Sequence, residues 1–176
     1  MKLSNIALIP DPQEWDLFFR ASTLLKQRFD SRFLLSKSSI PHVTLLQVEW
    51  DRSQEDLNRR VAPFKNDVTE LDLLGLCFLP GRHGEVWIEI PVKKTSGLTQ
   101  LQMALLSAVE VSFPRIKNGV GDNYRPHLTL GLIDNGRTIC LEEFEYSLLR
   151  KRGLKCALEL GLSGPSFEFV PGPPYE

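Results

Sequence analysis

The sequence predicts one compact domain in which helices and strands alternate and the second half repeats the order of the first. The chain has 176 residues, of which 42% are hydrophobic and 24% charged, an ordinary globular composition. Apolar residues recur at strand spacing and at helical spacing in alternating segments. The phrase PHVTL at 41–45 returns as PHLTL at 126–130. We therefore expect a single domain over 1–176 with two intertwined lobes, approximately 1–80 and 81–176.

The first half begins with a strand and an amphipathic helix. An apolar run at 6–9 is closed by Pro10, as expected of a strand that leaves a sheet. Residues 12–28 carry apolar side chains at helical spacing, with Asp11 as the expected N-cap and Pro12 in the first turn. The pattern then predicts a loop at 36–39, a strand at 42–50, a helix at 53–62 and a strand at 68–79.

The second half repeats this order. A strand at 85–92 follows the turn PGRHG and reaches Pro91 much as the first strand reaches Pro10. A helix at 98–113 is halted by Pro114, because proline interrupts helical hydrogen bonding. The remaining predicted elements are a loop at 118–123, a strand at 127–133, a helix at 142–150 and strands at 154–162 and 167–170.

Each copy of the repeated phrase begins a predicted strand with a histidine, followed two residues later by a threonine. Because residues i and i+2 of a strand project to the same face, His42 points with Thr44, and His127 with Thr129. If a pseudo-twofold relates the lobes, two imidazoles and two hydroxyls meet across a cleft. Beyond Thr129, Gly131 leaves room for a ligand or for another backbone to come close.

These groups suit a phosphodiester. One neutral imidazole can deprotonate an attacking water while the opposite, protonated imidazole donates to the departing alkoxide. The hydroxyls can bond to the non-bridging phosphate oxygens. A lone histidine at a strand start is more often a packed or edge residue, and a strand threonine is common for its β-branching. Their repetition in register favours one shared site, in which the pattern does not settle which histidine is the base.

Other residues are candidates with competing interpretations. Tyr124 and Arg125 precede the second motif and are candidates to offer a nucleotide an aromatic face and a cation, although the same residues suit a loop packed on the lobe edge. Trp50 and Trp87 are candidates to stack on a base, but we favour the interpretation that both side chains are buried. His83, in a turn flanked by glycines, is expected to be a surface residue.

Charge and cysteine usage argue against several functional classes. A net charge of −1 and a pI near 6.3 are not those of a protein that clamps long nucleic acid. The cysteines, Cys77, Cys140 and Cys156, are widely spaced and form no C-x-x-C pair, so we expect reduced thiols without a disulfide framework or zinc site. H-E-x-x-H is absent, and GVGDN lacks a full dinucleotide fingerprint. We expect no metal and no cofactor.

The sequence also lacks the patterns expected of membrane proteins and of secreted proteins. The first apolar run is too brief for a signal peptide, and no apolar run of about 20 residues could cross a bilayer. We therefore expect a soluble cytoplasmic protein with no membrane partner.

PHVTL and PHLTL resemble the paired His-x-Thr/Ser-hydrophobic motifs of the two-histidine phosphoesterase superfamily, which includes the RNA 2′,3′-cyclic phosphodiesterases, also called 2′-5′ RNA ligases. The resemblance extends over most of the chain in length and element order, and at the residue level only over the motifs. It implies a bilobal α+β fold in which two pseudo-twofold-related antiparallel β-sheets, with helices on their outer faces, enclose a central groove. It also implies that His42 and His127 are the acid/base pair and that Thr44 and Thr129 bind phosphate, without metal.

The expected function is therefore a metal-independent phosphodiesterase that opens 2′,3′-cyclic phosphates on RNA 3′ or 5′ ends or on small nucleotides. The modest charge fits a substrate held at its end, and we expect a monomer. The same site also suits 2′-5′ phosphodiester cleavage, action on ADP-ribose cyclic phosphate or, in reverse, RNA ligation, and these alternatives stay open. Two other classes stay open: a non-catalytic nucleotide- or phosphate-binding module, and a metal-binding protein that uses the histidine pair.

Overall fold

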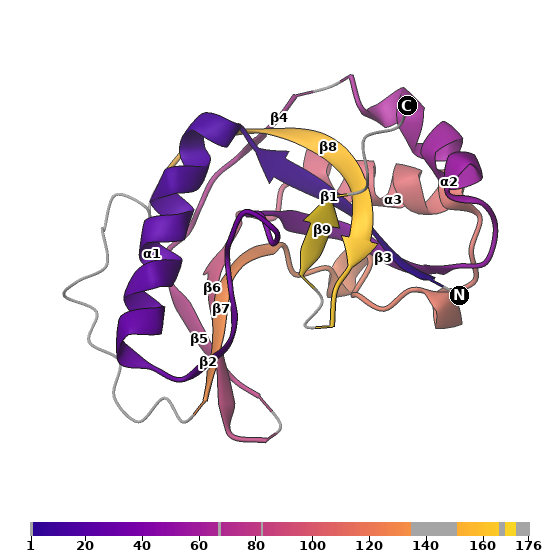
Figure 1. The fold of residues 1–176 in the computed structure, drawn as a ribbon. Helices are drawn as coiled ribbons and strands as arrows, with labels where there is room; N and C mark the ends of the chain where they lie inside the picture. Colours follow the sequence, from indigo (N-terminus) through magenta and orange to yellow (C-terminus); the bar gives the residue numbers. More distant parts are fainter. Residues whose placement is uncertain (1, 67, 82, 135–150, 166–167, 172–176) are drawn as a thin grey trace.

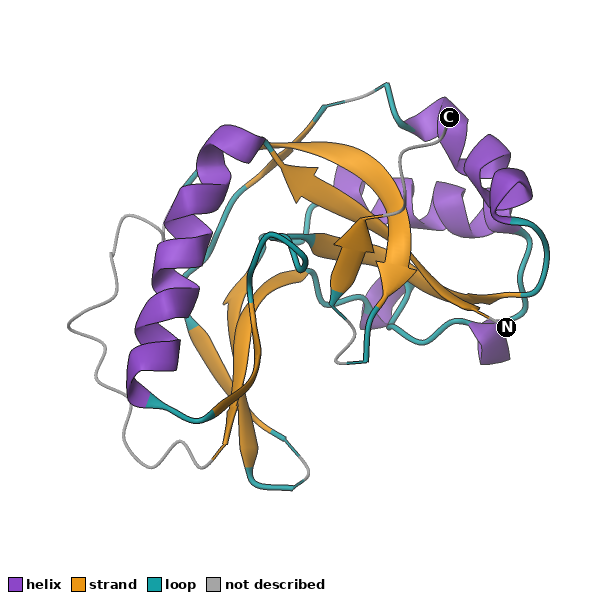
Figure 2. Ribbon diagram, in the orientation of Figure 1, coloured by secondary structure: helices purple, strands orange, loops and turns teal. Residues whose placement is uncertain are grey.

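The computed structural model describes residues 2–66, 68–81, 83–134, 151–165 and 168–171. Within these residues the fold is α+β, as predicted, with three α-helices (Figures 1 and 2). Its nine strands form one continuous sheet, where two separate sheets were expected. The strands are β1 (Lys2–Pro10), β2 (Ser31–Leu34), β3 (Val43–Trp50), β4 (Thr69–Leu71), β5 (Cys77–Pro80), β6 (Glu85–Pro91), β7 (His127–Asp134), β8 (Leu154–Ser163) and β9 (Phe169–Pro171). The helices are α1 (Trp15–Arg28), α2 (Gln54–Val61) and α3 (Ser96–Val109).

The two motif strands are neighbours at the centre of the sheet. The strand order is β4-β8-β1-β3-β7-β6-β5, with β2 beside β7 and β9 beside β8, and all paired strands are antiparallel. Only one residue pair, Val43 with Leu128, joins β3 to β7. We call β4, β8, β9, β1 and β3 the β1 side of the sheet, and β7, β2, β6 and β5 the β6 side. Each side contains strands from both halves of the sequence, and the lobe boundary near residue 80 stays a prediction.

The helices cross between the two sides. Helix α1 follows β1 in the chain but packs on β7 and β2, whereas α3 follows β6 and packs on β3 and α2 (Figure 1). Buried residues of α1 recur at helical spacing, at Phe18, Ala21, Ser22 and Leu25. Each helix thus covers the motif strand of the other half of the sequence.

A matching irregularity marks the two motif strands. The pairing of β1 with β3 shifts by one residue at Leu45, and the pairing of β6 with β7 shifts by one residue at Leu130. Such β-bulges leave a residue without a ladder partner. In each case a buried side chain of the covering helix reaches the bulged carbonyl at 2.8 Å: Ser22 of α1 donates to Leu130, and Gln102 of α3 to Leu45. The internal repeat therefore extends beyond the five-residue phrase.

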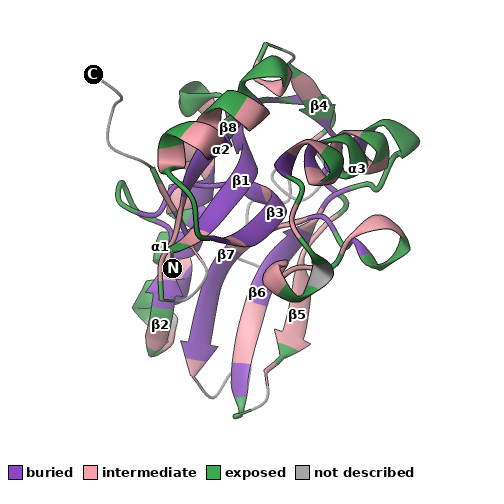
Figure 3. Cartoon of the chain, turned by 90° about the vertical axis from the view of Figure 1, so that its right-hand side faces the viewer, coloured by how far each residue is buried: buried purple, intermediate pink, exposed green. Residues whose placement is uncertain are grey.

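The core lies between the central strands and the helices that cover them. Figure 3 shows β1, β3 and β7 as buried along most of their length, while the helices expose their outer surfaces. The two residues of the central pair, Val43 and Leu128, are fully buried. Burial of apolar surface is the main favourable term in folding. The packing of α1 on β7 and of α3 on β3 therefore stabilises the central pair.

Most predicted elements are confirmed, and two predictions are corrected. The expected strand at 68–79 is two short strands, because β4 pairs with β8 at one end of the sheet and β5 pairs with β6 at the other. Gly75, between them, has a φ of 139°, which favours glycine. The helix expected to reach residue 113 ends at Val109, where Glu110 takes the left-handed conformation with φ 53°. Asp11 accepts a hydrogen bond from the Gln13 amide, but it caps a 3-10 turn that precedes α1.

Three further outcomes concern the ends and edges of elements. Strand β2 was not predicted, because four residues at an edge give little periodicity. The expected helix at 142–150 and residue 167 of the last expected strand lie outside the described residues. No helix in the described part of the chain is long and apolar enough to cross a membrane.

Candidate active site

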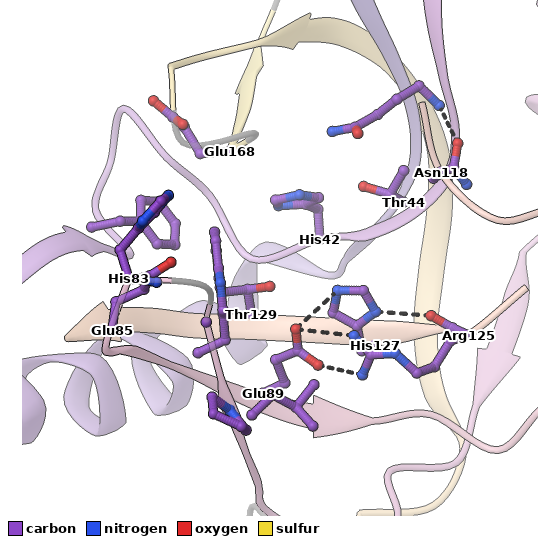
Figure 4. A pocket seen from close by; sticks show the side chains of 16 residues that line it. His42, Thr44, His83, Glu85, Glu89, Asn118, Arg125, His127, Thr129 and Glu168 are labelled. Atoms are coloured by element: carbon purple, nitrogen blue, oxygen red, sulfur yellow. Dashed lines mark hydrogen bonds and ion pairs between the residues drawn. The ribbon is translucent and has the colours of Figure 1, made fainter. Parts of the chain in front are cut away.

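The four motif side chains line one pocket. Its volume is about 590 Å³, and its wall includes His42, Thr44, His127 and Thr129 (Figure 4). Both threonines are partly exposed, and both line the pocket. The structure thus brings together two histidines that are 85 residues apart in the sequence.

The single pairing of β3 with β7 explains this convergence. Val43 and Leu128 face each other across antiparallel strands, and both side chains point into the core. Because side chains alternate along a strand, the residues on either side of each point to the opposite face, into the pocket. Because the two strands run in opposite directions from this central pair, the histidine of each motif lies across from the threonine of the other.

His42 is the more enclosed of the two rings. It is 7% exposed, and its centroid lies 5.6 Å from that of the Phe169 ring. Burial lowers the pKa of His42 from 6.5 to about 4, an effect that nearby His127 increases and the hydrogen bond to Ile40 opposes. Its Nδ1 lies 3.0 Å from the Ile40 carbonyl oxygen, which can only accept, so the proton of the neutral ring is on Nδ1. The neutral ring therefore leaves the Nε2 lone pair free to act as a base.

His127 has the same backbone anchor but different surroundings. Its Nδ1 lies 2.8 Å from the carbonyl oxygen of Arg125, two residues earlier, as Nδ1 of His42 does with Ile40. The His127 side chain is 31% exposed, and its Nε2 lies 3.4 Å from Oε1 of Glu89.

Glu89 is a pocket residue that sequence reasoning missed. Its side chain is only 5% exposed, and the guanidinium of Arg125 contacts both of its oxygens, at 2.5 and 3.3 Å. The available signal was a charged residue within the apolar run VWIEI, since a buried charge requires a partner. The hydrogen bond to Glu89 also raises the pKa of Arg125, so this candidate cation for a nucleotide is already engaged by a carboxylate.

Tyr124 lies behind the first motif instead of in the main pocket. It is 4% exposed, and its hydroxyl donates a 3.0 Å hydrogen bond to the Thr44 carbonyl. Its ring lines a smaller neighbouring pocket of about 260 Å³ together with Thr44, Arg125 and His127. This placement holds the backbone of the first motif, and the expected aromatic face for a nucleotide stays a prediction.

The remaining candidates divide between the pocket and the core. His83 is exposed, as expected of a turn residue, and it also lines the pocket. Trp87 contributes to the apolar part of the pocket wall with Phe33. Trp50 is buried, and its Nε1 donates to the Ser53 carbonyl at 2.9 Å, away from the pocket lining.

The space beside Gly131 is occupied by another part of the chain. A Cβ atom there would lie 3.1 Å from Leu34, 3.2 Å from Leu25 and 3.2 Å from the Phe33 carbonyl oxygen. The bulge at Leu130 turns Gly131 away from the motif face. The chain itself therefore fills the space, with two leucine side chains as well as the expected backbone, and leaves no room for a ligand.

The described residues contain no group of three or more His, Cys, Asp or Glu side chains arranged to hold a metal ion. That chemistry proceeds here without a metal or a cofactor stays a prediction.

No protein-family model matches the sequence, and no curated protein matches it either. Solved structures do match. The crystal structure of a phosphoesterase superposes with a TM-score of 0.52 at 14% identity, over 93% of this chain and 88% of that one. The structure of E. coli LigT complexed with NADP+ superposes with a TM-score of 0.57 at 14% identity, over the same shares of the two chains.

This chain has the LigT-like fold. The matched region spans nearly the whole chain, so the LigT-like fold accounts for both sides of the sheet and for the helices that cover them. The α+β fold that the resemblance of the two motifs implies is thus the fold observed.

Proposed function

We propose that this chain is a metal-independent phosphodiesterase of the two-histidine phosphoesterase superfamily that hydrolyses 2′,3′-cyclic phosphates of RNA ends or small nucleotides. The observation that carries the proposal is the convergence of two His-x-Thr motifs on one pocket. The LigT-like fold supports it, because a phosphoesterase is among the proteins that share the architecture.

The two imidazoles divide the acid and base roles. In the proposed hydrolysis, Nε2 of His42 takes a proton from water as the water oxygen bonds to phosphorus. The bond from phosphorus to one ribose oxygen breaks, and that oxygen takes the proton from Nε2 of His127. The reaction leaves His42 protonated and His127 neutral, and proton exchange with solvent restores both rings. The low pKa of His42 suits the base, because the ring is neutral at pH 7.

The threonines and the pocket wall position the substrate. The hydroxyls of Thr44 and Thr129 donate to non-bridging phosphate oxygens, whose charge grows as the fifth bond to phosphorus forms. The apolar wall formed by Phe33 and Trp87 offers a surface for the nucleobase. Thr44→Val is expected to weaken phosphate binding, whereas Thr44→Ser, which keeps the hydroxyl, is expected to retain activity.

A 2′-5′ phosphodiesterase or 2′-5′ RNA ligase activity is the second candidate. E. coli LigT, which shares the fold, was solved with NADP+, a dinucleotide that carries a phosphate on a ribose 2′ oxygen. A site for such a phosphate suits a 2′-5′ linkage as well as a 2′,3′-cyclic phosphate, since both place phosphorus at the 2′ oxygen.

The decisive experiment supplies purified protein with 2′,3′-cyclic nucleotides and, separately, with 2′-5′ oligoadenylate, in the presence of EDTA. We expect turnover of the cyclic phosphate, and a decrease of roughly 10²- to 10⁴-fold in His42→Ala and in His127→Ala, the usual contribution of one acid or base. Circular dichroism of each variant checks that the fold is retained.

Each other outcome selects a different function. Turnover of oligoadenylate alone supports the second candidate. Nucleotide binding without turnover supports a non-catalytic module, and activity that disappears on chelation supports a metal-dependent site. Full activity in either alanine variant contradicts the proposed division of roles.

A further inference from the structure

A second large pocket lies in the described part of the chain, beyond the ring of His42. Its volume is about 560 Å³, close to the 590 Å³ of the pocket that the motifs line, and within the range of small-molecule sites. It lies where the end of β1, the start of α1 and strands β8 and β9 meet (Figure 1). We call it the Trp15 pocket, and it shares no lining residue with the motif pocket.

Much of the wall of the Trp15 pocket is apolar. Ile9, Ile40 and Phe169 are buried and belong to a small core cluster that is separate from the main core. Trp15 packs against this cluster, and its Nε1 donates a 2.8 Å hydrogen bond to a backbone carbonyl oxygen. The indole thus has its polar atom satisfied within the chain. Such a wall can bury an apolar ligand and stack on an aromatic one.

The charged side chains around the pocket leave one cation without a partner. Asp11 accepts a 3.0 Å hydrogen bond from the Gln13 amide, and Lys65 lies 3.5 Å from Glu159. Lys155 also lines the pocket, and within the described residues no carboxylate forms an ion pair with it. An apolar wall with one unpaired ammonium favours an apolar ligand that carries a single negative charge.

Strand β8 places this ammonium beside open space. Lys155, Ala157 and Glu159 are exposed and alternate with buried residues, so their side chains share one face of the strand. Ala157 is paired in register with Ile9, on the face that carries the small core cluster. Because Ala157 contributes only a methyl group, the space between the two charged side chains stays open.

The Trp15 pocket is separated from His42 by a single layer of side chains. Phe169 lines the pocket, and the centroid of its ring lies 5.6 Å from that of His42. Ile40 lines the same pocket, and its carbonyl oxygen lies 3.0 Å from Nδ1 of His42. A ligand in the Trp15 pocket would therefore contact two residues that surround the His42 ring.

We propose that the Trp15 pocket is a second binding site, for a small aromatic anion such as an aryl carboxylate. The aromatic rings of the ligand lie against Trp15 and Phe169, and its acid group lies at Lys155. This site goes beyond the proposed function and does not depend on it, because the pocket contains neither motif.

Two fluorescent probes that differ in charge test the site. Anilinonaphthalene sulfonate is an aromatic anion, and phenylnaphthylamine has the same ring system without the sulfonate. Lys155→Gln is expected to raise the Kd of the sulfonate by roughly 2- to 5-fold, as for loss of one exposed ion pair, and to leave that of the neutral probe unchanged. Glu159→Gln, which frees Lys65, is expected to lower the Kd of the sulfonate. Equal effects on the two probes overturn the proposal.

Ala157→Trp provides a steric test. The added indole projects into the pocket, so both probes are expected to bind more weakly, by on the order of 10-fold or more. Ala104→Trp is the control, because Ala104 is an exposed alanine of α3 that does not line the pocket. Unchanged binding in Ala157→Trp overturns the proposal. If this variant does not fold, as checked by circular dichroism, the two charge variants still decide.

Resonances of the histidine rings locate the bound probe. Binding is expected to shift the signals of His42, through Phe169, and to leave those of His83, in the motif pocket, unchanged. An unshifted His42 at saturation overturns the proposal. Displacement of the sulfonate by a 2′,3′-cyclic nucleotide places the probe in the motif pocket, which also overturns it. None of these readouts requires turnover, so they are independent of the proposed hydrolysis.

Two other occupants would give different results. Residues 172–176 follow Pro171, which lines the pocket. Probe binding that appears only after these residues are removed assigns the pocket to the chain itself. A wild-type dimer that Ala157→Trp converts to a monomer, as measured by sedimentation velocity, assigns it to a second copy. Either result overturns the proposal of a small-molecule site.

Discussion

At the residue scale, the two His-x-Thr motifs have the same backbone arrangement but different neighbours. His42 and His127 follow a proline, precede a motif threonine by two residues and anchor Nδ1 on a carbonyl two residues earlier. Only the neighbours differ, with Phe169 beside one ring and Glu89 beside the other. Because protonation of an imidazole responds to burial and to nearby charge, the repeat can specify the position of both rings without specifying their protonation.

Burial of His42 predicts a pH dependence of stability. The unfolded chain protonates this ring near pH 6.5, whereas the folded chain does so only near pH 4. Between these values the unfolded state binds the additional proton, so stability falls as pH is lowered through this window, by up to about 3 kcal/mol. Urea unfolding between pH 7 and pH 4.5 measures this decrease.

His42→Asn is expected to show a smaller decrease over the same range, because the variant lacks the titrating ring. His83→Asn provides the control, since His83 is exposed and its replacement is expected to leave the decrease as in wild type. The prediction is wrong if wild type and His42→Asn lose the same free energy of unfolding between pH 7 and pH 4.5.

At the element scale, each motif strand is supported by the helix of the other half of the chain. At the bulges, the carbonyl oxygens of Leu45 and Leu130 have no hydrogen-bond partner on the neighbouring strand. Side chains of α3 and α1 donate hydrogen bonds to them instead. A bulge also changes the direction of a strand, here directly after the threonine of each motif. The crossed helices therefore contribute to the shape of the pocket as well as to the core.

Removal of one such support is expected to destabilise the fold. Ser22 is fully buried; its hydroxyl donates to Leu130 at 2.8 Å and accepts from the Leu35 amide at 2.9 Å. Ser22→Ala leaves both backbone groups without this partner, which is expected to lower the free energy of unfolding by roughly 2 kcal/mol. Urea denaturation measures the difference.

The adjacent Thr23 supplies the control, because it is exposed on the same helix. Thr23→Ala is expected to change stability by less than about 0.5 kcal/mol, as is usual for surface substitutions. Equal effects of Ser22→Ala and Thr23→Ala would show that the buried hydroxyl contributes nothing specific.

At the scale of the whole molecule, the sheet and its charge favour a small or end-bound substrate. The net charge is −1, and the described pocket lining contains the carboxylates Glu85, Glu89 and Glu168 with the guanidinium of Arg125. Hydrogen bonds from its own backbone amide and from that of His83 lower the pKa of Glu85, so it is ionised at neutral pH. Such a pocket offers few counter-charges to a chain of phosphates.

The salt dependence of activity follows from this charge. We expect log(kcat/KM) for a 2′,3′-cyclic mononucleotide to fall with log[salt] with a slope between 0 and about −1, as for contact with about one phosphate. An oligonucleotide that ends in a cyclic phosphate is expected to give a similar slope. A slope steeper than about −3 for the oligonucleotide alone would contradict the idea that only its end is held.

The sequence by itself determined the local elements and the faces of the motif residues. The period of two places each histidine with its threonine, and most strands and the helices have the type predicted for them, because these patterns depend on near neighbours in the chain. The same period predicts the four residues, His42, Thr44, His127 and Thr129, that converge on the pocket. Short edge strands and the break at Gly75 were missed or misplaced, since tertiary pairing decides where they end.

Only the tertiary structure decided which segments meet. It placed α1 over β7 and α3 over β3, filled the space at Gly131 with two leucine side chains and the Phe33 backbone, and brought Glu89 between Arg125 and His127. These contacts join residues that lie far apart in the sequence. The physical reason is that strand order, bulges and burial depend on the packing of the whole core, whereas periodicity records only the direction in which each side chain leaves its own strand or helix.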